Sequence, residues 1–369
     1  HLGKRPLQKL HTFCIFHSLH SITCITVYAV LLCYVLIMIR ALSLSKHSIK
    51  QTMSTTQTNN SFEPAYLALL RNGQLADRVE QAYHHLEDCD LCARYCHMNR
   101  KQTIKGAVCH TGEMAVVNSY GPHHGEENPL RGWNGSGTIF FSWCSLRCVF
   151  CQNWDISQKG AGVETTPEQL ADMMLSLQRQ GCHNINFVTP SHVVTQIIAA
   201  IAIAAERGLQ LPLVYNTGGY DSLEALKLLD GIIDIYMPDM KYGDSKLARQ
   251  YSKVRNYTEV NFTAVKEMHR QVGNLVLDDK GVALRGLLVR HLVLPKNIAG
   301  TEQVLQFLAS EISSNTYINI MDQYHPCYRA DDYPAVDRPI TSKEYQDAIK
   351  ASHNAGLHRL DNCRNIHWP

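Results

Sequence analysis

The sequence predicts an α/β fold built on a parallel sheet. Two observations predict it. From Thr138 onward, short apolar segments alternate with helical ones, and polar or thiol side chains follow the ends of the apolar segments. Ligand-binding residues gather at such carboxyl ends in parallel sheets. Six strand–helix units can curl into an incomplete barrel or spread as an open doubly wound sheet, and the pattern alone leaves both open.

The core domain is expected over residues 133–369, and its elements follow from local signals. The six expected strands are 138–141, 185–188, 213–215, 232–237, 287–294 and 317–321. Helices are expected at 166–180, 191–207, 223–229, 244–272, 301–313 and 341–355. The sequences TPEQ from Thr166 and TSKE from Thr341 are capping boxes that mark helix starts. A hairpin turn is expected at Asp279-Lys280-Gly281.

Residues 53–132 are expected to form a small, helical and Cys-rich N-terminal cap. The stretch 64–85 has leucines at helical spacing and leads directly into the sequence CDLCARYC. From Ala107 to Gly137 the chain is rich in Gly, His, Asn and Pro, which predicts irregular structure over a surface.

The first 52 residues are expected to be an apolar leader that is not part of the core protein. Residues 22–39 are an uncharged apolar run near the lower length limit for crossing a bilayer. Because Met53 opens a polar stretch typical of an ordinary protein start, we favour a leader that is dispensable or translated from upstream sequence. The alternative is a membrane anchor through residues 22–39.

Charge and cysteine content limit the class of function. The 369 residues carry 35 Lys+Arg and 33 Asp+Glu. This balance, without a Lys/Arg block, indicates no nucleic-acid partner. The 13 cysteines include clusters with CxxC-type spacing. In a chain of this length, such clusters are typical of a reduced cytoplasmic metalloprotein and not of a secreted disulfide scaffold.

Three cysteines, Cys144, Cys148 and Cys151, follow the first expected strand in the sequence CSLRCVFC. Disulfide pairing would leave one thiol over, and a closed tetrahedral zinc site needs four ligands. A metal cluster with one coordination position open for a substrate fits this count better. A partial zinc site that borrows a distant ligand is the alternative.

The sequence CSLRCVFC resembles the CxxxCxxC loop of the radical S-adenosylmethionine (SAM) enzymes, including the aromatic Phe150 before the last cysteine. The resemblance implies a partial (β/α)6 barrel and a [4Fe–4S] cluster on Cys144, Cys148 and Cys151, with SAM on the fourth iron. It implies reductive cleavage of SAM to a 5′-deoxyadenosyl radical, with electrons from a donor such as flavodoxin or ferredoxin.

Residues 85–360 further resemble the pyruvate formate-lyase activating enzymes, in a branch with an extra N-terminal Cys cluster. The similar segments are YNTGGY, MPDMK, VRHLVLP and QYHP. The resemblance implies a SAM-binding set of Phe150, Asn216, Thr217, Met237, Asp239 and Lys241. It implies catalytic roles for Arg290 and His325.

Activation of a glycyl radical enzyme, and hence a protein substrate, is the function that this branch implies. Radical modification of a small molecule or of RNA is an alternative. A zinc-stapled, non-catalytic binding module is an alternative from a different class. The chain departs from the radical SAM pattern after the second strand, where FVTPSH replaces a Gly-Gly-Glu type turn and Thr189 or Ser191 would supply polar contacts. Cys327 is expected to be a buried, inert thiol.

An upstream set of four cysteines forms a second candidate metal site. Its members are Cys89, Cys92, Cys96 and Cys109. Four thiolates suit either a structural zinc ion or a second iron–sulfur cluster, and their spacing leaves both open.

Overall fold

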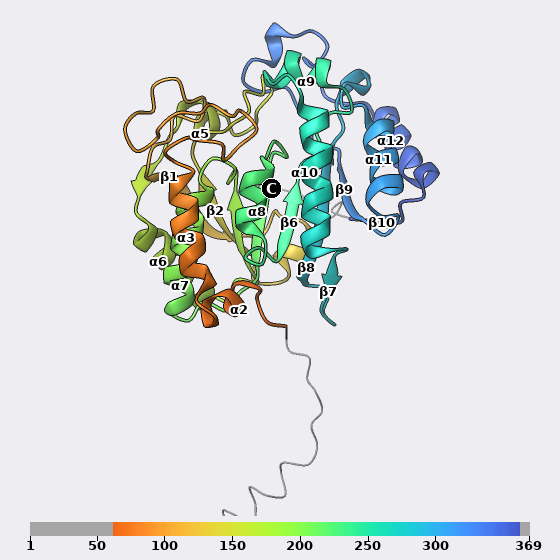
Figure 1. Cartoon of the computed structure of the whole chain (residues 1–369). Coiled ribbons are helices and arrows are strands. Elements are labelled where there is room, and N and C mark those ends of the chain that lie inside the picture. The colour runs from red at the N-terminus through yellow and green to blue at the C-terminus, as the bar shows by residue number, and fades with distance from the viewer. Residues whose placement is uncertain (1–61, 362–369) are drawn as a thin grey trace, which may run out of the picture. The chain divides into compact units, whose positions relative to one another are not determined.

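The structure, a computed structural model, describes residues 62–361 of the chain (Figure 1). The leader 1–52, with its apolar run 22–39, lies outside the described residues. Within residues 62–361, none of the helices combines the length and the apolar character that crossing a bilayer requires.

A mostly parallel sheet forms the centre of the fold, as predicted. Its strands are β1 Ala115–His123, β2 Ser136–Phe141, β3 Val163–Thr165, β4 Ile185–Val188, β5 Leu213–Thr217, β6 Ile235–Pro238, β7 Val276–Leu277, β8 Ala283–Leu292, β9 Tyr317–Met321 and β10 Arg359–Leu360. The order is β10-β9-β8-β6-β5-β4-β2-β1-β3, with β7 paired to β8. Strands β2, β4, β5, β6, β8 and β9 are parallel and are the six that the sequence predicts.

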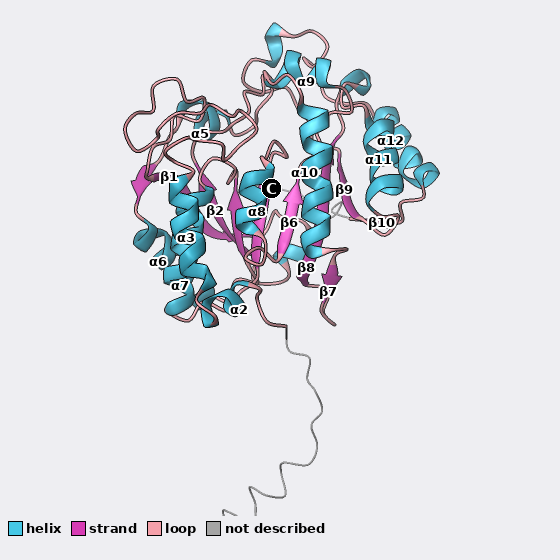
Figure 2. Ribbon diagram, in the orientation of Figure 1, coloured by secondary structure: helices cyan, strands magenta, loops and turns pink. Residues whose placement is uncertain are grey.

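The strand order defines an incomplete barrel. The six predicted strands and the two-residue strand β10, which pairs parallel with β9, neighbour one another in chain order, whereas a doubly wound sheet reverses its order in the middle. Right-handed crossovers, the general rule for parallel strands, place the helices of such a sheet on one side, and Figure 2 shows α7, α8 and α10 in front of the strands. Strands β3 and β10 end the sheet and do not pair with each other, so the barrel stays open.

The helices between the strands begin largely where the sequence predicts. They are α2 Tyr66–Arg71, α3 Gln74–His84, α4 Asn128–Arg131, α5 Trp154–Lys159, α6 Pro167–Arg179, α7 Val194–Glu206, α8 Leu223–Leu229, α9 Ser245–Ser252, α10 Tyr257–Val272, α11 Thr301–Phe307 and α12 Ser342–Ala355. Both capping boxes are confirmed. Thr166 caps α6 by accepting from the Gln169 amide at 3.2 Å, and Thr341 caps α12 in the same way.

The stretch 64–85 is helical, as predicted, and Gly73 in a left-handed conformation (φ 80°) divides it into α2 and α3. One prediction about the N-terminal segment is wrong in part. Residues 107–137 are not all irregular, because β1 pairs antiparallel with both β2 and β3. Its Asn, Gly and Pro residues have low strand propensity, but the ladder to neighbouring strands overrides it. Residues 62–361 belong to one compact unit.

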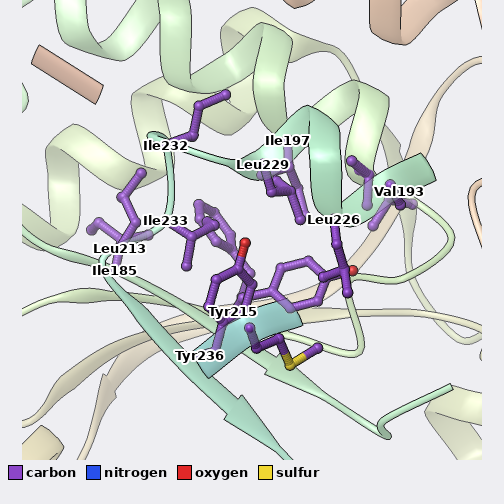
Figure 3. Close-up of a cluster of buried hydrophobic side chains, with 14 of the residues drawn as sticks. Ile185, Val193, Ile197, Leu213, Tyr215, Leu226, Leu229, Ile232, Ile233 and Tyr236 are labelled. Carbon is purple, nitrogen blue, oxygen red and sulfur yellow. The ribbon is translucent and has the colours of Figure 1, made fainter. Parts of the chain in front are cut away.

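The main core lies between the sheet and its helices. Figure 3 shows side chains of β4, β5 and β6 meeting those of α7 and α8, among them Ile185, Tyr215, Ile197 and Leu226. All four are fully buried. Successive strand residues point to opposite faces, so residues such as Val214 and Asn216 face the inside of the barrel. The core therefore holds the strand ends in place from one side and leaves the inner face for a site.

Candidate active site

The three-cysteine loop joins β2 to α5 and is fixed by its backbone. The amides of Arg147 and Val149 donate to the carbonyls of Ser252 (3.1 Å) and Tyr251 (2.8 Å) at the end of α9. Trp143 has a positive φ of 67° and its amide donates to Ile156 O at 3.0 Å. The loop is thus anchored at both ends, which limits the positions that its thiols can take.

The thiols of this loop lie together in a sheltered environment. Cys148 contacts the Ser252 hydroxyl at 2.9 Å, and Cys151 contacts the Ser157 hydroxyl at 3.1 Å. Burial raises the pKa of Cys144 to about 12 and that of Cys148 to about 11, and neighbouring thiolates add to the rise. Among residues 62–361, no group of three or more His, Cys, Asp or Glu side chains is placed so that it could hold a metal ion. The chemistry of the donor set, three cysteine thiols in one loop, suits an iron–sulfur cluster, and binding of the metal would displace the thiol protons.

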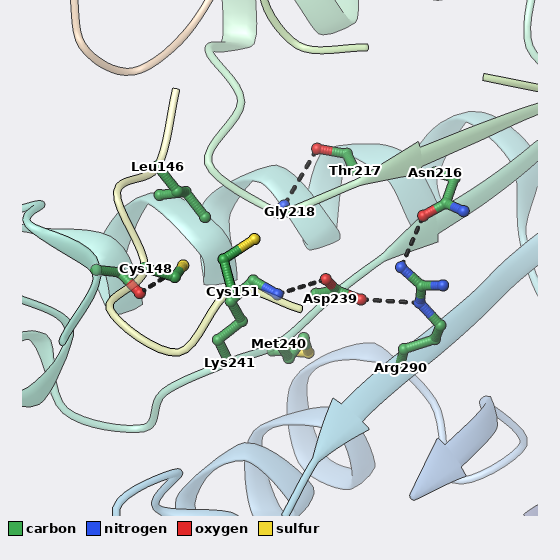
Figure 4. Close-up of polar contacts among 12 residues, drawn as sticks. Leu146, Cys148, Cys151, Asn216, Thr217, Gly218, Asp239, Met240, Lys241 and Arg290 are labelled. Carbon is green, nitrogen blue, oxygen red and sulfur yellow. Dashed lines mark hydrogen bonds and ion pairs between the residues drawn. The ribbon is translucent and has the colours of Figure 1, made fainter. Parts of the chain in front are cut away.

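A buried chain of charges begins beside this loop. Figure 4 shows Asp239 between Lys241 and Arg290, with Cys148 and Cys151 on the Lys241 side. Lys241 Nζ lies 2.6 Å from Asp239 Oδ2, and Arg290 Nε lies 2.8 Å from Asp239 Oδ1. Burial alone would raise the pKa of Asp239, but the two cations outweigh it and lower that pKa below its ordinary value. Asp239 therefore stays charged and orients both cations.

Arg290 connects this chain of charges to β5. Its Nη2 donates to Asn216 Oδ1 at 2.7 Å. Asn216 and Arg290 both line a cavity of about 820 Å³ inside the barrel. The cavity also contacts Gln152, the residue after Cys151. The thiol loop, Asn216, Asp239 and Arg290 thus meet at the carboxyl ends of the strands.

Thr217 and Met237 lie next to this group but expose little surface. Thr217 is 1% exposed, and its hydroxyl donates to Asp221 Oδ2 at 2.7 Å. Met237 is fully buried and packs with Val214 and Leu288 on the inner face. Within the described residues, both therefore act through packing and hydrogen bonds that hold their strands.

The turn after β5 is closely packed against Asp239. Gly219 has a φ of 75°, and a Cβ built there would lie 2.2 Å from Asn261 Nδ2 and 2.3 Å from the Asp239 carbonyl oxygen. Asn261 Nδ2 in turn donates to the carbonyls of Gly219 and Asp239, each at 3.0 Å. The turn fixes the position of Asp239.

Gly219→Ala should therefore destabilise the fold and disturb the site. We expect the free energy of unfolding to fall by roughly 2–4 kcal/mol, from overpacking plus an unfavourable φ. Gly73→Ala is the matched control, since Gly73 has a φ of 80° but nothing within 4 Å of the built Cβ. Urea denaturation of both variants measures the difference, and equal losses would contradict this account.

Phe150 belongs to the thiol loop, and His325 and Cys327 lie beside it. His325 is exposed, and its Nδ1 lies 3.1 Å from Gln152 Nε2. Phe150 is buried with its ring edge-on to Tyr324, 5.7 Å between centroids. Cys327 is half-buried and not buried as expected, and burial followed by the charge of Cys151 raises its pKa.

The turn after β4 supports its neighbours with polar contacts. Thr189 has a φ of 62°, and its amide donates to the carbonyl of Asn216 at 2.9 Å. The Ser191 hydroxyl lies 3.0 Å from that of Thr217, and Ser191 is 4% exposed. Both residues therefore fix the carboxyl end of β5 through these hydrogen bonds.

The four upstream cysteines line one small cavity of about 10 Å³. Arg100 is 2% exposed, and its Nη1 donates to Cys89 Sγ at 3.6 Å. The hydrogen bond with Cys96, together with Arg100, lowers the pKa of Cys89 to about 5 against the effect of burial. The four thiols thus share one cavity, with a cation at one sulfur.

Two buried carboxylates, Glu126 and Glu127, also line the cavity inside the barrel and were not predicted from the sequence. They are 7% and 4% exposed. Glu127 Oε1 lies 4.0 Å from Arg290 Nε and accepts from Asn319 Nδ2 at 3.1 Å. Their sequence signal is a pair of acidic residues within the segment GEENP, which was assigned as surface loop.

Comparisons with known proteins agree with this geometry. The radical SAM superfamily profile matches residues 138–294. Uncharacterized protein MJ0674 of Methanocaldococcus jannaschii is 31% identical over 290 residues, covering 76% of this chain and 78% of the relative. Uncharacterized protein MJ0808 of the same organism is 24% identical over 291 residues, covering 72% of this chain and 80% of the relative.

Two solved structures are also similar. The FeFe-hydrogenase maturase HydG from Carboxydothermus hydrogenoformans is 12% identical with a TM-score of 0.44, covering 60% of this chain and 51% of that one. A radical SAM methyltransferase from Sphaerobacter thermophilus is 13% identical with a TM-score of 0.41, covering 60% of this chain and 64% of that one. The chain spans less than two thirds of the length of either structure.

The fold is an incomplete parallel barrel, and three thiols follow its first parallel strand. These two features are typical of enzymes that hold a metal cluster at the strand ends. The chain belongs to the radical SAM superfamily. The family implies an enzyme with a [4Fe–4S] cluster and SAM as cofactors, and the donor set of Cys144, Cys148 and Cys151 fits that cluster.

Proposed function

We propose that the chain cleaves SAM reductively and uses the resulting 5′-deoxyadenosyl radical to abstract hydrogen from a second molecule. The observation that carries the proposal is the placement of the thiol loop beside Lys241, with Gln152, the residue after Cys151, lining the same cavity as Asn216 and Arg290. When bound, the cluster supplies the electron that breaks the carbon–sulfur bond.

The residues of this chain bind and orient the cofactor. In this proposal, Asn216, Asp239 and Lys241 supply polar contacts to SAM, with Arg290 and His325 closing the site from either side. Both cations contact Asp239, Lys241 at 2.6 Å and Arg290 at 2.8 Å. A charge arrangement fixed in advance reduces the cost of ordering these side chains on binding. Phe150, Thr217 and Met237 support it through packing.

The substrate class follows from the resemblance and from the cavity. The resemblance to pyruvate formate-lyase activating enzymes supports a protein glycine as the hydrogen donor. The cavity of about 820 Å³ supports a small molecule or a side chain of a peptide as the competing proposal. Its carboxylates argue against RNA, whose phosphates they would repel. Membership of an enzyme family argues against the zinc-stapled binding module.

The full chain, reconstituted anaerobically with iron and sulfide, tests the proposal. We expect about four irons at the first site and formation of 5′-deoxyadenosine from SAM after dithionite reduction. Iron analysis and chromatography measure both. A protein that incorporates no cluster, or incorporates one and leaves SAM intact, would refute the proposal. We propose a flavodoxin or ferredoxin of the cytoplasm as the natural electron donor.

The upstream cysteines are proposed to hold a second metal centre. Their cavity adjoins the first loop, because Arg94 Nε donates to Ser145 O at 2.8 Å and Arg147 donates to the Val108 carbonyl. A second cluster here would extend the route for electrons, whereas zinc would fix the N-terminal segment.

Cys92→Ala should remove the second metal and leave the first cluster in place. Cys92 is 7% exposed among the other thiols, so its loss leaves the metal with three ligands. We expect a lower melting temperature and either about four irons or about one zinc fewer per chain. Metal analysis of variant and wild type decides between zinc and iron. Unchanged metal content would contradict a second centre.

A further inference from the structure

We infer that Glu126 and Glu127 form a binding site for a cationic group, an amine or a guanidinium, on the molecule that the radical attacks. The inference rests on the proposed function and deepens it by naming the chemical class of the substrate. Both residues lie between β1 and α4 and line the cavity inside the barrel. The β1–α4 connection thereby gains a role in substrate recognition.

Glu127 has an oxygen that the protein leaves unpaired. Its Oε1 accepts from Asn319 Nδ2 at 3.1 Å. Its Oε2 has no hydrogen-bond partner among the described residues, although Glu127 is only 4% exposed. Because a buried carboxylate oxygen without a donor is unfavourable, this atom calls for a donor from a ligand.

Arg290 does not supply this hydrogen bond. Its Nε lies 2.8 Å from Asp239 Oδ1 and its Nη2 lies 2.7 Å from Asn216 Oδ1, as Figure 4 shows. The distance from Nε to Glu127 Oε1 is 4.0 Å, beyond a hydrogen bond. The guanidinium is therefore committed to Asp239 and Asn216 and gives Glu127 only a long-range attraction.

The charges around the cavity favour a cation. The charged side chains that line it within residues 62–361 are Glu126, Glu127, Asp322, Asp361 and Arg290, joined by the titratable His123. His123 Nδ1 lies 3.5 Å from Glu126 Oε1, and the two side chains form an ion pair when His123 is protonated. Four carboxyl groups thus face one arginine and one histidine, and even with the pKa of Glu127 raised to about 7 the excess of negative charge attracts amines and guanidiniums and repels phosphates and carboxylates.

The pKa of Glu127 agrees with a missing partner. Burial raises it to about 7, the charge of Glu126 adds to the rise, and Arg290 opposes it. His123 and Arg290 hold the pKa of Glu126 below its ordinary value despite burial. A cation beside Glu127 would favour its ionised form, so that two charged carboxylates would clasp the ligand.

The cavity has room for such a ligand and directs it toward the thiol loop. Its volume of about 820 Å³ lies in the range of small-molecule sites. Glu127 and Gln152 line the same cavity, and Gln152 follows Cys151 directly. A molecule held by its cationic end at Glu127 can therefore extend toward the place where the radical forms.

Binding of two probes of equal shape tests the inference. Butylguanidinium carries the charge, whereas butylurea has the same shape without it. Calorimetry on the full chain, without SAM, should show butylguanidinium binding with a Kd near 1 mM and butylurea binding about tenfold more weakly or worse. Glu127→Gln should weaken butylguanidinium binding about tenfold, because it keeps the shape and the Asn319 hydrogen bond but removes the charge.

Glu206→Gln is the matched control. Glu206 is exposed at the end of α7 and outside the cavity, so affinity for butylguanidinium should stay within about twofold. Glu126→Gln provides a second test should Glu127→Gln fail to fold, and it should also weaken binding. Equal affinities for the two probes, an unchanged affinity in the cavity variants, or no binding of butylguanidinium by the wild type would each overturn the inference.

The test separates this inference from the proposed function. Binding of butylguanidinium is measured without cluster, SAM or reductant. A chain that binds the cation but forms no 5′-deoxyadenosine would refute the proposed reaction and keep the cation site. A chain that cleaves SAM but does not discriminate between the probes would keep the reaction and refute the site.

Discussion

Cys144→Ala, Cys148→Ala and Cys151→Ala should each abolish 5′-deoxyadenosine formation, by about a thousandfold or to below detection. The loop offers three thiols, and a cluster held by two loses both its geometry and its stability. We expect iron at this site to fall by about four per chain. The measurement is SAM cleavage after dithionite reduction, together with iron analysis and the visible absorbance of the cluster.

Cys182→Ala is the matched control for these variants. Cys182 is also a buried thiol, at 3% exposed, but it packs in the main core beside Gly137 and belongs to neither cysteine set. Its loss should cost about 1 kcal/mol of stability and leave SAM cleavage within about twofold. A variant at Cys144, Cys148 or Cys151 that keeps its cluster and its activity, as the control does, would contradict the assignment of these three ligands.

Local sequence signals were enough to predict the scaffold and the thiol loop. Strand runs such as INFV at β4 and capping boxes such as that of Thr166 depend on residues a few positions apart, and the structure confirms them. The thiol loop lies where the first parallel strand ends, at Phe141. Such features need no knowledge of distant contacts, which is why the sequence alone predicts them.

Features that depend on side-chain direction and on long-range pairing were harder to predict. Asn216 and Thr217 are neighbours in one segment, but successive strand residues point to opposite faces. Asn216 therefore reaches the cavity, while the Thr217 hydroxyl contacts Asp221 and Ser191. Glu127 reaches the cavity only because β1 pairs with β2, a ladder between segments that the residue pattern does not predict.

Asp239→Ala should destabilise the fold by about 3–5 kcal/mol at neutral pH. Its side chain is 13% exposed and contacts both Lys241 and Arg290, which are 20% and 19% exposed. Removing the shared carboxylate leaves two buried cations without their counter-charge, and breaking a buried pair costs this much. Urea denaturation of the protein without cofactors measures the loss, which also separates it from any effect on SAM binding.

The dependence on pH distinguishes a lost charge from lost packing. Because the folded pKa of Asp239 is lowered from its ordinary 3.8, its charge stabilises the fold above that pH, and the benefit is lost as pH falls through the folded value. The difference between wild type and Asp239→Asn, which keeps the shape, should therefore shrink in acid. Asp172→Ala is the control, since Asp172 is 68% exposed and its pair with Arg207 should contribute about 0–1 kcal/mol. A loss at Asp239 as small as that at Asp172, or one that persists unchanged in acid, would mean that Asp239 does not hold the two cations together by charge.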